Sequence, residues 1–395
     1  MKYRLLFILV ALLTLVLAAA QCGSPAAPPA APQQESAATS APTSENTEAA
    51  AQAETADSGL AKELSVYNWA DYIDETLLTK YEEKYGVKII YDTFASNEDL
   101  LAKMQAGATG YDVIFPSDYM VAQMSELGLL AEINKDNIPN MKNLDPKFLD
   151  APYDPGNKYC MPYQWGTTGI AYSTKVFSEE TPDSWAYLFD PEMAKKWADA
   201  GGINLLNDQR ELIGAAMKYL GYSLNDKDEE HLKQARDVIL AIKPYVKTFN
   251  SEGYDDELLI PGEVVISHAW SGDAFVAMDA TYNEDTEESD WGYAIPTEGA
   301  VLWQDNMCIP ASSERQATAE HFINFLLEPE NGAAITNFTF YGSPNKAAEE
   351  FISPDILEDP GIYPPPEVMA KLEMMESLGE TVFVYDRLWT EIKSQ

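Results

Sequence analysis

Positive charge is scarce in this chain of 395 residues. Lysine and arginine total 26 against 64 aspartates and glutamates, which gives a formal net charge of −38. A field of that sign repels nucleic acid and anionic lipid headgroups, so neither is expected as a partner. The excess of acid also favours solubility, and most of these carboxylates must lie on solvated faces. Only a few of them can line a pocket.

Catalytic and metal-binding signatures are missing as well. The chain has no G-x-S-x-G elbow, no Walker loop and no G-x-G-x-x-G motif. Its three histidines, His231, His268 and His321, are isolated in the sequence, and His268 is expected to be structural. We therefore predict no catalytic residue, no metal ligand and no cofactor, and we predict that the protein is not an enzyme.

Only one long apolar run is present, at residues 5–20 behind Lys2 and Arg4. This is the layout of a secretory signal peptide, predicted here for residues 1–22, and it indicates export to the periplasm or the outer face of the cell membrane. Cys22 is a candidate lipid-attachment residue, although Gln21 stands where a small residue is usual, and residues 18–20 also fit an ordinary A-x-A cleavage site. Residues 23–59 lack aromatic side chains and are rich in Ala, Pro, Ser, Thr and Gln, which predicts a disordered tether.

Cysteine is rare, and two cysteines remain beyond Cys22. Cys160 and Cys308 each stand two residues before a proline, in strand-like stretches. One disulfide between them fits an exported protein. The sequence does not show whether their Cα atoms lie within bridging distance, so we expect two separately buried thiols.

The rest of the chain, roughly 330 residues, exceeds what one hydrophobic core usually organises, so two domains are expected. Helix and strand signals alternate along it, and glycines end several of the helices. This order predicts a mostly parallel α/β sheet, in which ligands gather where strands end, and Ser117 and Trp270 each follow a predicted strand. The predicted helices span 74–85, 97–105, 211–220 and 317–327, and the predicted strands span 87–91, 111–115 and 263–267.

Tryptophan and carboxylate occur together three times, at Trp69 with Asp71, Trp270 with Asp273, and Trp303 with Asp305. An aromatic face and a carboxylate both attract cations, so a site lined with both selects positive nitrogens joined by apolar stems. The candidate ligand is a small amine or polyamine. The other five tryptophans are assigned to the core: Trp165, Trp185, Trp197, Trp291 and Trp389.

Seven short motifs follow one another between residues 64 and 393. They are Tyr67-Asn68-Trp69-Ala70-Asp71-Tyr72, Ser96-Asn97-Glu98, Pro116-Ser117-Asp118-Tyr119, Asn143-Leu144-Asp145-Pro146, Met161-Pro162-Tyr163, Trp270-Ser271-Gly272-Asp273 and Asp359-Pro360-Gly361-Ile362-Tyr363-Pro364-Pro365. As an ordered set they resemble the periplasmic spermidine/putrescine-binding proteins of ABC transporters.

The resemblance implies a two-lobed periplasmic-binding-protein fold of class II type, each lobe a mixed, mostly parallel sheet flanked by helices, with the ligand in the cleft between the lobes. Residues 64–171 and 305–354 would form lobe 1, and residues 172–304 and 355–395 would form lobe 2. The implied function is to bind putrescine, spermidine or both and to deliver them to the permease subunits of an ABC transporter. Lobe closure would be the signal that the permease reads, and a monomer is expected.

The resemblance also implies a set of ligand-binding residues. Asp305 would be the main amine anchor, with tryptophans as walls for the methylene stems. Met375 and Asp273 resemble putrescine-specific members, whereas Tyr119, Asp208 and Trp303 resemble spermidine-preferring ones, so the preferred polyamine stays open. The complete set is Trp69, Asp71, Tyr72, Ser117, Tyr119, Asp208, Glu211, Ser251, Trp270, Asp273, Trp303, Asp305 and Tyr341.

Several alternatives remain at this point. Asp208 also suits a helix cap, and Asp71 and Asp273 also suit a solvated surface. A carbohydrate hydrolase or receptor is a rival because Trp-lined acidic clefts bind sugars, and a metal-binding receptor is another because carboxylates suit hard cations. If the acids do share one empty cleft, their mutual repulsion is expected to raise some of their pKa values.

Overall fold

The computed structural model describes residues 59–107 and 110–394. The signal segment 1–22, Cys22 and all but the last residue of the predicted tether 23–59 lie outside the described residues. Among the residues described, no helix has the length and apolar character needed to cross a membrane.

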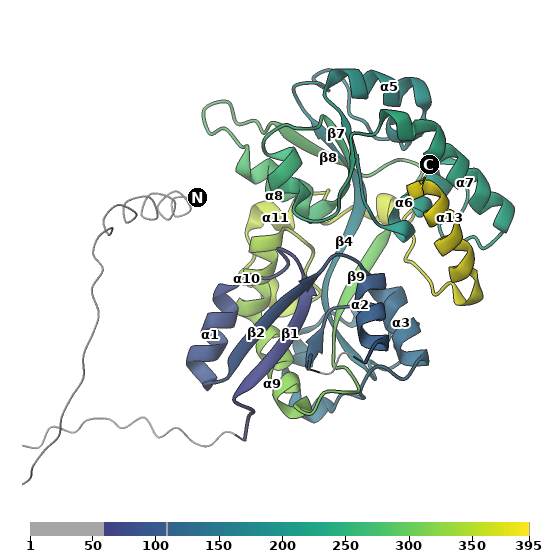
Figure 1. Cartoon of the computed structure of the whole chain (residues 1–395). Coiled ribbons are helices and arrows are strands. Elements are labelled where there is room, and N and C mark those ends of the chain that lie inside the picture. The colour runs from purple at the N-terminus through teal and green to yellow at the C-terminus, as the bar shows by residue number, and fades with distance from the viewer. Residues whose placement is uncertain (1–58, 108–109, 395) are drawn as a thin grey trace, which may run out of the picture. The chain divides into compact units, whose positions relative to one another are not determined.

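Within residues 59–107 and 110–394, the strands form a nine-stranded sheet whose two ends belong to two lobes (Figure 1). Its order is β2-β1-β3-β9-β4-β7-β5-β6, and β8 pairs with β4 outside this path. The strands are β1 (Glu63–Trp69), β2 (Lys88–Phe94), β3 (Val113–Ile114), β4 (Cys160–Ser173), β5 (Ile203–Leu205), β6 (Thr248–Phe249), β7 (Ile266–Trp270), β8 (Trp291–Ala294) and β9 (Leu302–Cys308).

Parallel pairing is confined to the two ends of the sheet, where β1 joins β2 and β3, and β5 joins β6 and β7. Every pairing of the long strands β4 and β9 is antiparallel. The sheet is therefore mixed, with parallel β-α-β units on either side of an antiparallel centre. Strand β4 pairs with β9 through its first half and with β7 and β8 through its second half, so it runs through both lobes.

Helices cover both ends of the sheet (Figure 1). Around β1, β2 and β3 lie α1 (Thr76–Tyr85), α2 (Asn97–Gln105), α3 (Asp118–Glu126), α9 (Gln316–Leu326) and α10 (Pro329–Thr339). The other lobe carries α4 (Ala186–Phe189), α5 (Pro191–Ala200), α6 (Gln209–Tyr219), α7 (Glu229–Ile242), α8 (Ser271–Ala280) and α13 (Val382–Ser394). Shorter elements include α11 (Pro354–Leu357), α12 (Pro366–Met369) and the single-turn π-helix η6 (Asp255–Leu259).

Glycine and capping signals set the helix ends. Helix α1 stops at Gly86, whose φ of 68° lies in the left-handed region that favours glycine. Helix α2 has the predicted bounds, and the Ser96 side chain caps it by accepting from the Asp99 N–H. Strand β7 begins later than predicted because the preceding turn, through Gly262 at φ 73°, holds the Glu263 N–H on the Leu258 carbonyl. Trp270 is consequently the last residue of β7 rather than a residue beyond the predicted strand end at 267.

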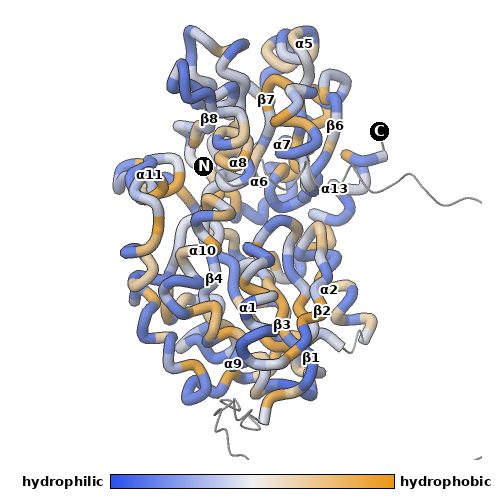
Figure 2. Tube along the Cα trace, turned by 90° about the vertical axis from the view of Figure 1, so that its left-hand side faces the viewer, coloured by the Kyte–Doolittle hydropathy of each residue, from blue (hydrophilic) through white to orange (hydrophobic). Residues whose placement is uncertain are grey.

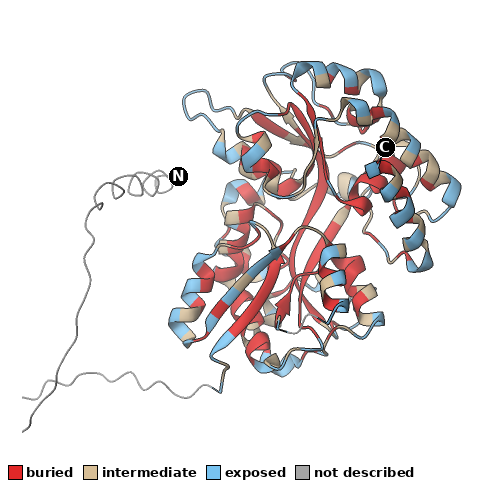
Figure 3. Ribbon diagram, viewed as in Figure 1, coloured by how far each residue is buried: buried red, intermediate tan, exposed pale blue. Residues whose placement is uncertain are grey.

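Each end of the sheet has its own hydrophobic cluster. One gathers buried side chains of β1, β3, α1, α3 and α9, and the other gathers those of β5, α4, α6, α7 and α13. Hydrophobic segments, orange in Figure 2, occur in both lobes, and the strands are mostly buried in Figure 3. Four of the five tryptophans assigned to the core are buried, and Trp389 is half-buried against the second cluster: Trp165, Trp185, Trp197 and Trp291 are the buried four.

The expectation of two separate thiols at Cys160 and Cys308 is wrong. The two residues are direct partners in the antiparallel pairing of β4 with β9, their Cα atoms lie 4.4 Å apart, and they form a disulfide. Antiparallel neighbours of this kind lie within the distance that a disulfide requires. The bridge closes a sequence separation of 148 residues.

Candidate ligand-binding site

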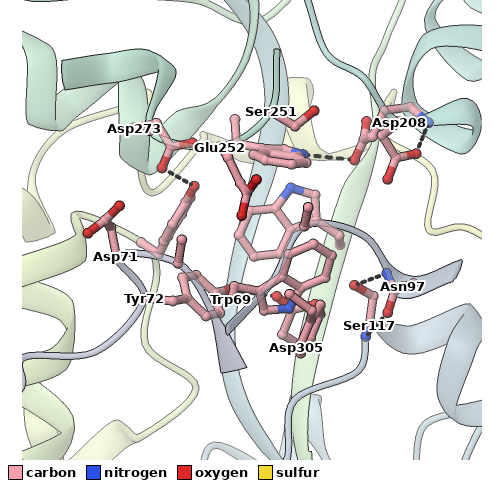
Figure 4. Close-up of a pocket in the computed structure, with 18 of the residues that line it drawn as sticks. Trp69, Asp71, Tyr72, Asn97, Ser117, Asp208, Ser251, Glu252, Asp273 and Asp305 are labelled. Carbon is pink, nitrogen blue, oxygen red and sulfur yellow. Dashed lines mark hydrogen bonds between the residues drawn. The ribbon is translucent and has the colours of Figure 1, made fainter. Parts of the chain in front are cut away.

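A pocket lies where strands and helices from both lobes meet (Figure 4). It encloses about 770 Å³ of space, including open solvent at its mouth. Every residue that the sequence predicted for the site lines this one pocket. They are Trp69, Asp71, Tyr72, Ser117, Tyr119, Asp208, Glu211, Ser251, Trp270, Asp273, Trp303, Asp305 and Tyr341.

The fold brings these side chains together because most of them stand at strand ends and helix starts. Trp69 ends β1, and Trp270 ends β7. Ser117 precedes α3, and its N–H and hydroxyl are held by Asn97 at 3.1 Å and 2.9 Å. Asp305 lies within β9 and forms an isolated bridge with Ser117. The strand ends where an α/β sheet is expected to bind ligands therefore line this pocket.

Aromatic rings form much of the pocket wall. The rings of Trp69 and Trp270 lie 6.1 Å apart in an edge-on arrangement, and Tyr341 lies 4.9 Å from Trp303 and 5.3 Å from Tyr72. Hydrogen bonds fix two of the indoles, since Trp69 Nε1 donates to the Phe115 carbonyl at 2.9 Å and Trp270 Nε1 donates to Glu211 Oε1 at 3.1 Å. Rigid aromatic faces of this kind suit both methylene stems and cations.

The residues that line the pocket carry negative charge with no basic side chain among them, although the charge of Arg210, which is not a lining residue, opposes the raised pKa values of Asp118 and Asp208. Eight carboxylic acids are among its lining residues, and no lysine, arginine or histidine is. A site of this composition favours a ligand with more than one positive charge. The eight are Asp71, Asp118, Asp208, Glu211, Glu252, Asp255, Asp273 and Asp305.

Asp305 and Glu211 are buried acids with one free oxygen each. Tyr72 donates its hydroxyl to Asp305 Oδ2 at 2.8 Å, while Asp305 Oδ1 has no hydrogen-bond partner in the described part of the chain. Glu211 Oε2 also lacks a partner there. Burial raises the pKa of Asp305 to about 7, against the opposing effect of the Ser117 and Tyr72 hydroxyls. Burial and the charge of Asp208 raise the pKa of Glu211 to about 8.

Asp71 and Asp273 lie at one end of the pocket, away from Asp208 (Figure 4). Asp273 is half-buried and accepts a hydrogen bond from the Tyr341 hydroxyl at 3.0 Å. Burial and the neighbouring Asp255 raise its pKa to about 8, so it is not an ordinary solvated acid. Asp71 is exposed at the pocket edge, with a φ of 51° in the left-handed region, and partial burial raises its pKa.

Asp208 does cap its helix, as the alternative interpretation held. Its Oδ1 accepts from the N–H groups of Arg210 at 2.8 Å and Glu211 at 3.0 Å. It is also buried against the pocket, so capping and pocket lining coexist in one side chain. Its contact with a ligand stays a prediction.

One face of the Tyr119 ring is occupied by the protein itself. The guanidinium of Arg210, which is buried, lies 4.5 Å from the centre of the Tyr119 ring, and the Tyr119 hydroxyl donates to Glu98 at 3.3 Å. Arg210 also donates to the Glu376 carbonyl at 3.0 Å. One cation–π position on Tyr119 is therefore taken before any ligand arrives.

Sequence reasoning did not assign several acids that the structure places in the pocket. Asp118 lies between two predicted site residues, Ser117 and Tyr119. It is fully buried, and burial raises its pKa to about 8. Glu252 and Asp255 come from the segment beside Ser251. A signal for Asp255 existed, since it directly follows Tyr254 and repeats the pairing of aromatic residue with acid.

Met375 and His268 are both buried. Met375 lines the pocket and is 6% exposed, so it adds an apolar side chain to the wall, and its likeness to putrescine-specific members stays a prediction. His268 is fully buried, and neither ring nitrogen finds a hydrogen-bond partner among the described residues. Burial lowers its pKa to about 3, which leaves it neutral and structural.

Comparison with known proteins supports the same class of protein. Residues 76–364 match the bacterial extracellular solute-binding proteins. The chain belongs to this family. This solute-binding protein is 38% identical to the putrescine-binding periplasmic protein SpuD of Pseudomonas aeruginosa, over 87% of its own length and 95% of the relative's. It is 33% identical to the spermidine/putrescine-binding periplasmic protein of Escherichia coli, over 84% and 91% of the two chains.

Solved structures of relatives have the same two-lobed fold. A putative spermidine/putrescine ABC transporter from Listeria monocytogenes aligns with a TM-score of 0.78 and 38% identity, over 85% of this solute-binding protein and 99% of that chain. The lipoprotein TpPotD of Treponema pallidum aligns with a TM-score of 0.71 and 28% identity, over 84% and 99% of the two chains. The family resemblance and the two-lobed α/β fold inferred from the sequence are confirmed. The expectation of a mostly parallel sheet is wrong for the centre of the sheet, where β4 and β9 make only antiparallel pairings.

Proposed function

We propose that this protein binds a polyamine, putrescine or spermidine or both, outside the cytoplasm and delivers it to the permease of an ABC transporter. The observation that carries the proposal is the composition of the pocket, which combines eight acids and three tryptophans with no basic side chain. The named relatives, which bind putrescine or spermidine, support the same ligand class.

The pocket offers a polyamine two kinds of contact. Each cation–π contact in a desolvated site contributes roughly 1–2 kcal/mol, and each hydrogen bond to a charged group a similar amount. Several such contacts, less the cost of immobilising the ligand and closing the lobes, correspond to micromolar binding or tighter, about −8 kcal/mol or beyond. Asp305 and Glu211, each with a buried free oxygen, are the acids best placed to accept from an ammonium.

Charge also separates this proposal from its rivals. A neutral sugar would leave the buried acids of the pocket without compensation, since no basic side chain lines it. For a resident metal, the described residues contain no group of three or more His, Cys, Asp or Glu side chains able to hold an ion. A solute-binding role needs no catalytic group or cofactor, and we propose neither.

The remaining parts of the proposal concern the whole chain. Residues 64–171 and 305–354 would form one lobe, and residues 172–304 and 355–395 the other, closing around the amine as a monomer. Cys22 would carry a lipid anchor, and residues 23–59 would let the folded part reach away from the membrane. The net charge of −38 argues against nucleic acid as a partner.

Calorimetric titration of the purified protein with putrescine and with spermidine tests the function. Saturable binding of at least one amine is expected, and excess neutral sugar or Ca²⁺ is expected not to compete. Competition between the two amines in the same cell would then rank their chain lengths, which the mixed features at Tyr119 and Met375 leave open. The proposal fails if neither amine binds at millimolar concentration while a sugar or metal ion does.

A further inference from the structure

One end of the pocket carries three acids from three separate elements. Asp71 follows β1, Asp255 begins the π-helix η6, and Asp273 lies in the first turn of α8. All three line the pocket, and Asp71 and Asp273 are seen together at the end away from Asp208 in Figure 4. Their charges act on one another, since Asp255 and Asp71 both raise the pKa of Asp273.

Asp255 is the most deeply placed of the three, with 8% of its surface exposed. Among the described residues, no side chain donates a hydrogen bond to it and no lysine or arginine pairs with it; only backbone N–H groups of Asp255 and Asp256 favour its ionised form. Asp273, by contrast, receives the Tyr341 hydroxyl. A buried carboxylate without a cationic partner is costly, so this end of the pocket is completed by a cation that the protein does not supply.

A helix start offers the alternative explanation for Asp255. Acids are favoured in the first turn of a helix, and Asp255 and Asp256 both occupy that turn of η6. This explanation fits the exposed Asp256 equally well. It does not account for the burial of Asp255 against the pocket that Asp71 and Asp273 also line.

We propose that Asp255 is a specificity-determining residue of the polyamine site and that, with Asp71 and Asp273, it receives one primary ammonium end of the ligand. A primary ammonium has three N–H donors, which three carboxylates from separate directions can accept. A secondary amine has two, and a hydroxyl in the same place has no charge. This assignment rests on the proposed function and identifies the chemical group that this end of the pocket reads.

Asp255→Asn tests the assignment, because it removes the charge and keeps the shape. Asp256→Asn is the matched control, since it makes the same change at the neighbouring, exposed position. Each variant of the full chain is titrated with putrescine and with 4-aminobutan-1-ol, in which a hydroxyl replaces one ammonium. Asp255→Asn is expected to weaken putrescine binding about tenfold or more and to narrow the preference for putrescine over the amino alcohol. Asp256→Asn is expected to stay within about threefold, with the preference kept.

The ratio of the two affinities is measured within each variant, so a general loss of folded protein does not alter it. Asp255→Ser serves as a second variant, and it is also expected to reduce the preference for putrescine over 4-aminobutan-1-ol. An unchanged ratio in both Asp255 variants overturns the assignment and leaves the proposed function intact. Equal effects of Asp255→Asn and Asp256→Asn also overturn the assignment, because they would show that any loss of negative charge in this segment weakens binding. If the unmodified protein binds neither putrescine nor spermidine, the assignment and the proposed function fail together.

Discussion

The carboxylates of Asp305 and Asp273 differ in their hydrogen-bond partners and in their neighbouring charges. Asp305 is 5% exposed and keeps one buried oxygen without a partner, whereas Asp273 is half-buried and has Asp71 and Asp255 as neighbours. Asp305→Ala is therefore expected to weaken amine binding by about 2–5 kcal/mol, because an ammonium would be left buried without its counter-ion. Asp273→Ala leaves two acids at its end of the pocket and is expected to cost less, about 1–2 kcal/mol.

Calorimetry of both variants with the same amine checks this ranking. Glu284→Ala, at an exposed acid that is not among the pocket lining, serves as the control for the loss of one negative charge and is expected to change the affinity little. Equal losses for Asp305→Ala and Asp273→Ala would show that the two acids are ranked incorrectly.

At the level of single residues, the sequence predicted part of the pocket from tryptophans that stand close to an acid in the chain. Trp69, Trp270 and Trp303 were chosen because an acid lies within three positions of each, and all three line the pocket. Asp118 and Asp255 were not assigned, because their burial depends on segments distant in the sequence. Nor did the sequence indicate that Arg210 covers Tyr119, since this contact joins α6 to α3.

Among the elements, the antiparallel pair of β4 and β9 is tied by the disulfide of Cys160 with Cys308. The two cysteines are 148 positions apart in the sequence. Breaking the disulfide therefore increases the conformational entropy of the unfolded chain considerably. Reduction, or replacement of both cysteines by alanine, is expected to lower the free energy of unfolding by about 2–5 kcal/mol. Denaturant unfolding with and without reductant measures the change.

The alanine pair provides the control for that experiment, because reductant should have no effect on it. If the midpoint of the unmodified protein is the same with and without reductant, the bridge does not contribute to stability.

Element boundaries followed from the sequence where local signals were strong. The end of α1 before Gly86 and both bounds of α2 agree with the prediction, because a left-handed glycine and a serine cap act within one turn, whereas α1 begins at Thr76 and not at 74. Helix α8 was not predicted, since it is buried on several sides and lacks an amphipathic pattern. The π-helix η6 is too short to show a period. The disulfide of Cys160 with Cys308 could not be predicted, because it depends on the register between β4 and β9, which are far apart in sequence.

For the molecule as a whole, the acids of the pocket make stability depend on pH. Burial raises the pKa of Asp118, Glu211 and Asp273 to about 8, above the ordinary values of 3.8 for Asp and 4.5 for Glu. Between about pH 4 and pH 8 the folded, ligand-free protein therefore holds protons that the unfolded chain releases. These acids make the free energy of unfolding fall as pH rises through this window, because they bind more protons in the folded state. Buried His268, whose pKa is lowered to about 3, opposes this fall below its ordinary value of 6.5, but it is one group against several acids. The net charge of −38 acts in the same direction through self-repulsion.

A bound polyamine is expected to remove much of this pH dependence, since its ammonium groups hold the same carboxylates in their ionised form. The Tm of the ligand-free protein should fall between pH 5 and pH 8.5, and saturating putrescine or spermidine should flatten that fall. Binding at pH 7 should also release protons, which appears as a dependence of the calorimetric enthalpy on the buffer. Asp273→Asn, which removes one of the titrating acids, should reduce both effects. A ligand-free Tm that rises over this range, or a slope that saturating amine leaves unchanged, would show that the crowded acids of the pocket do not govern the stability of the empty protein.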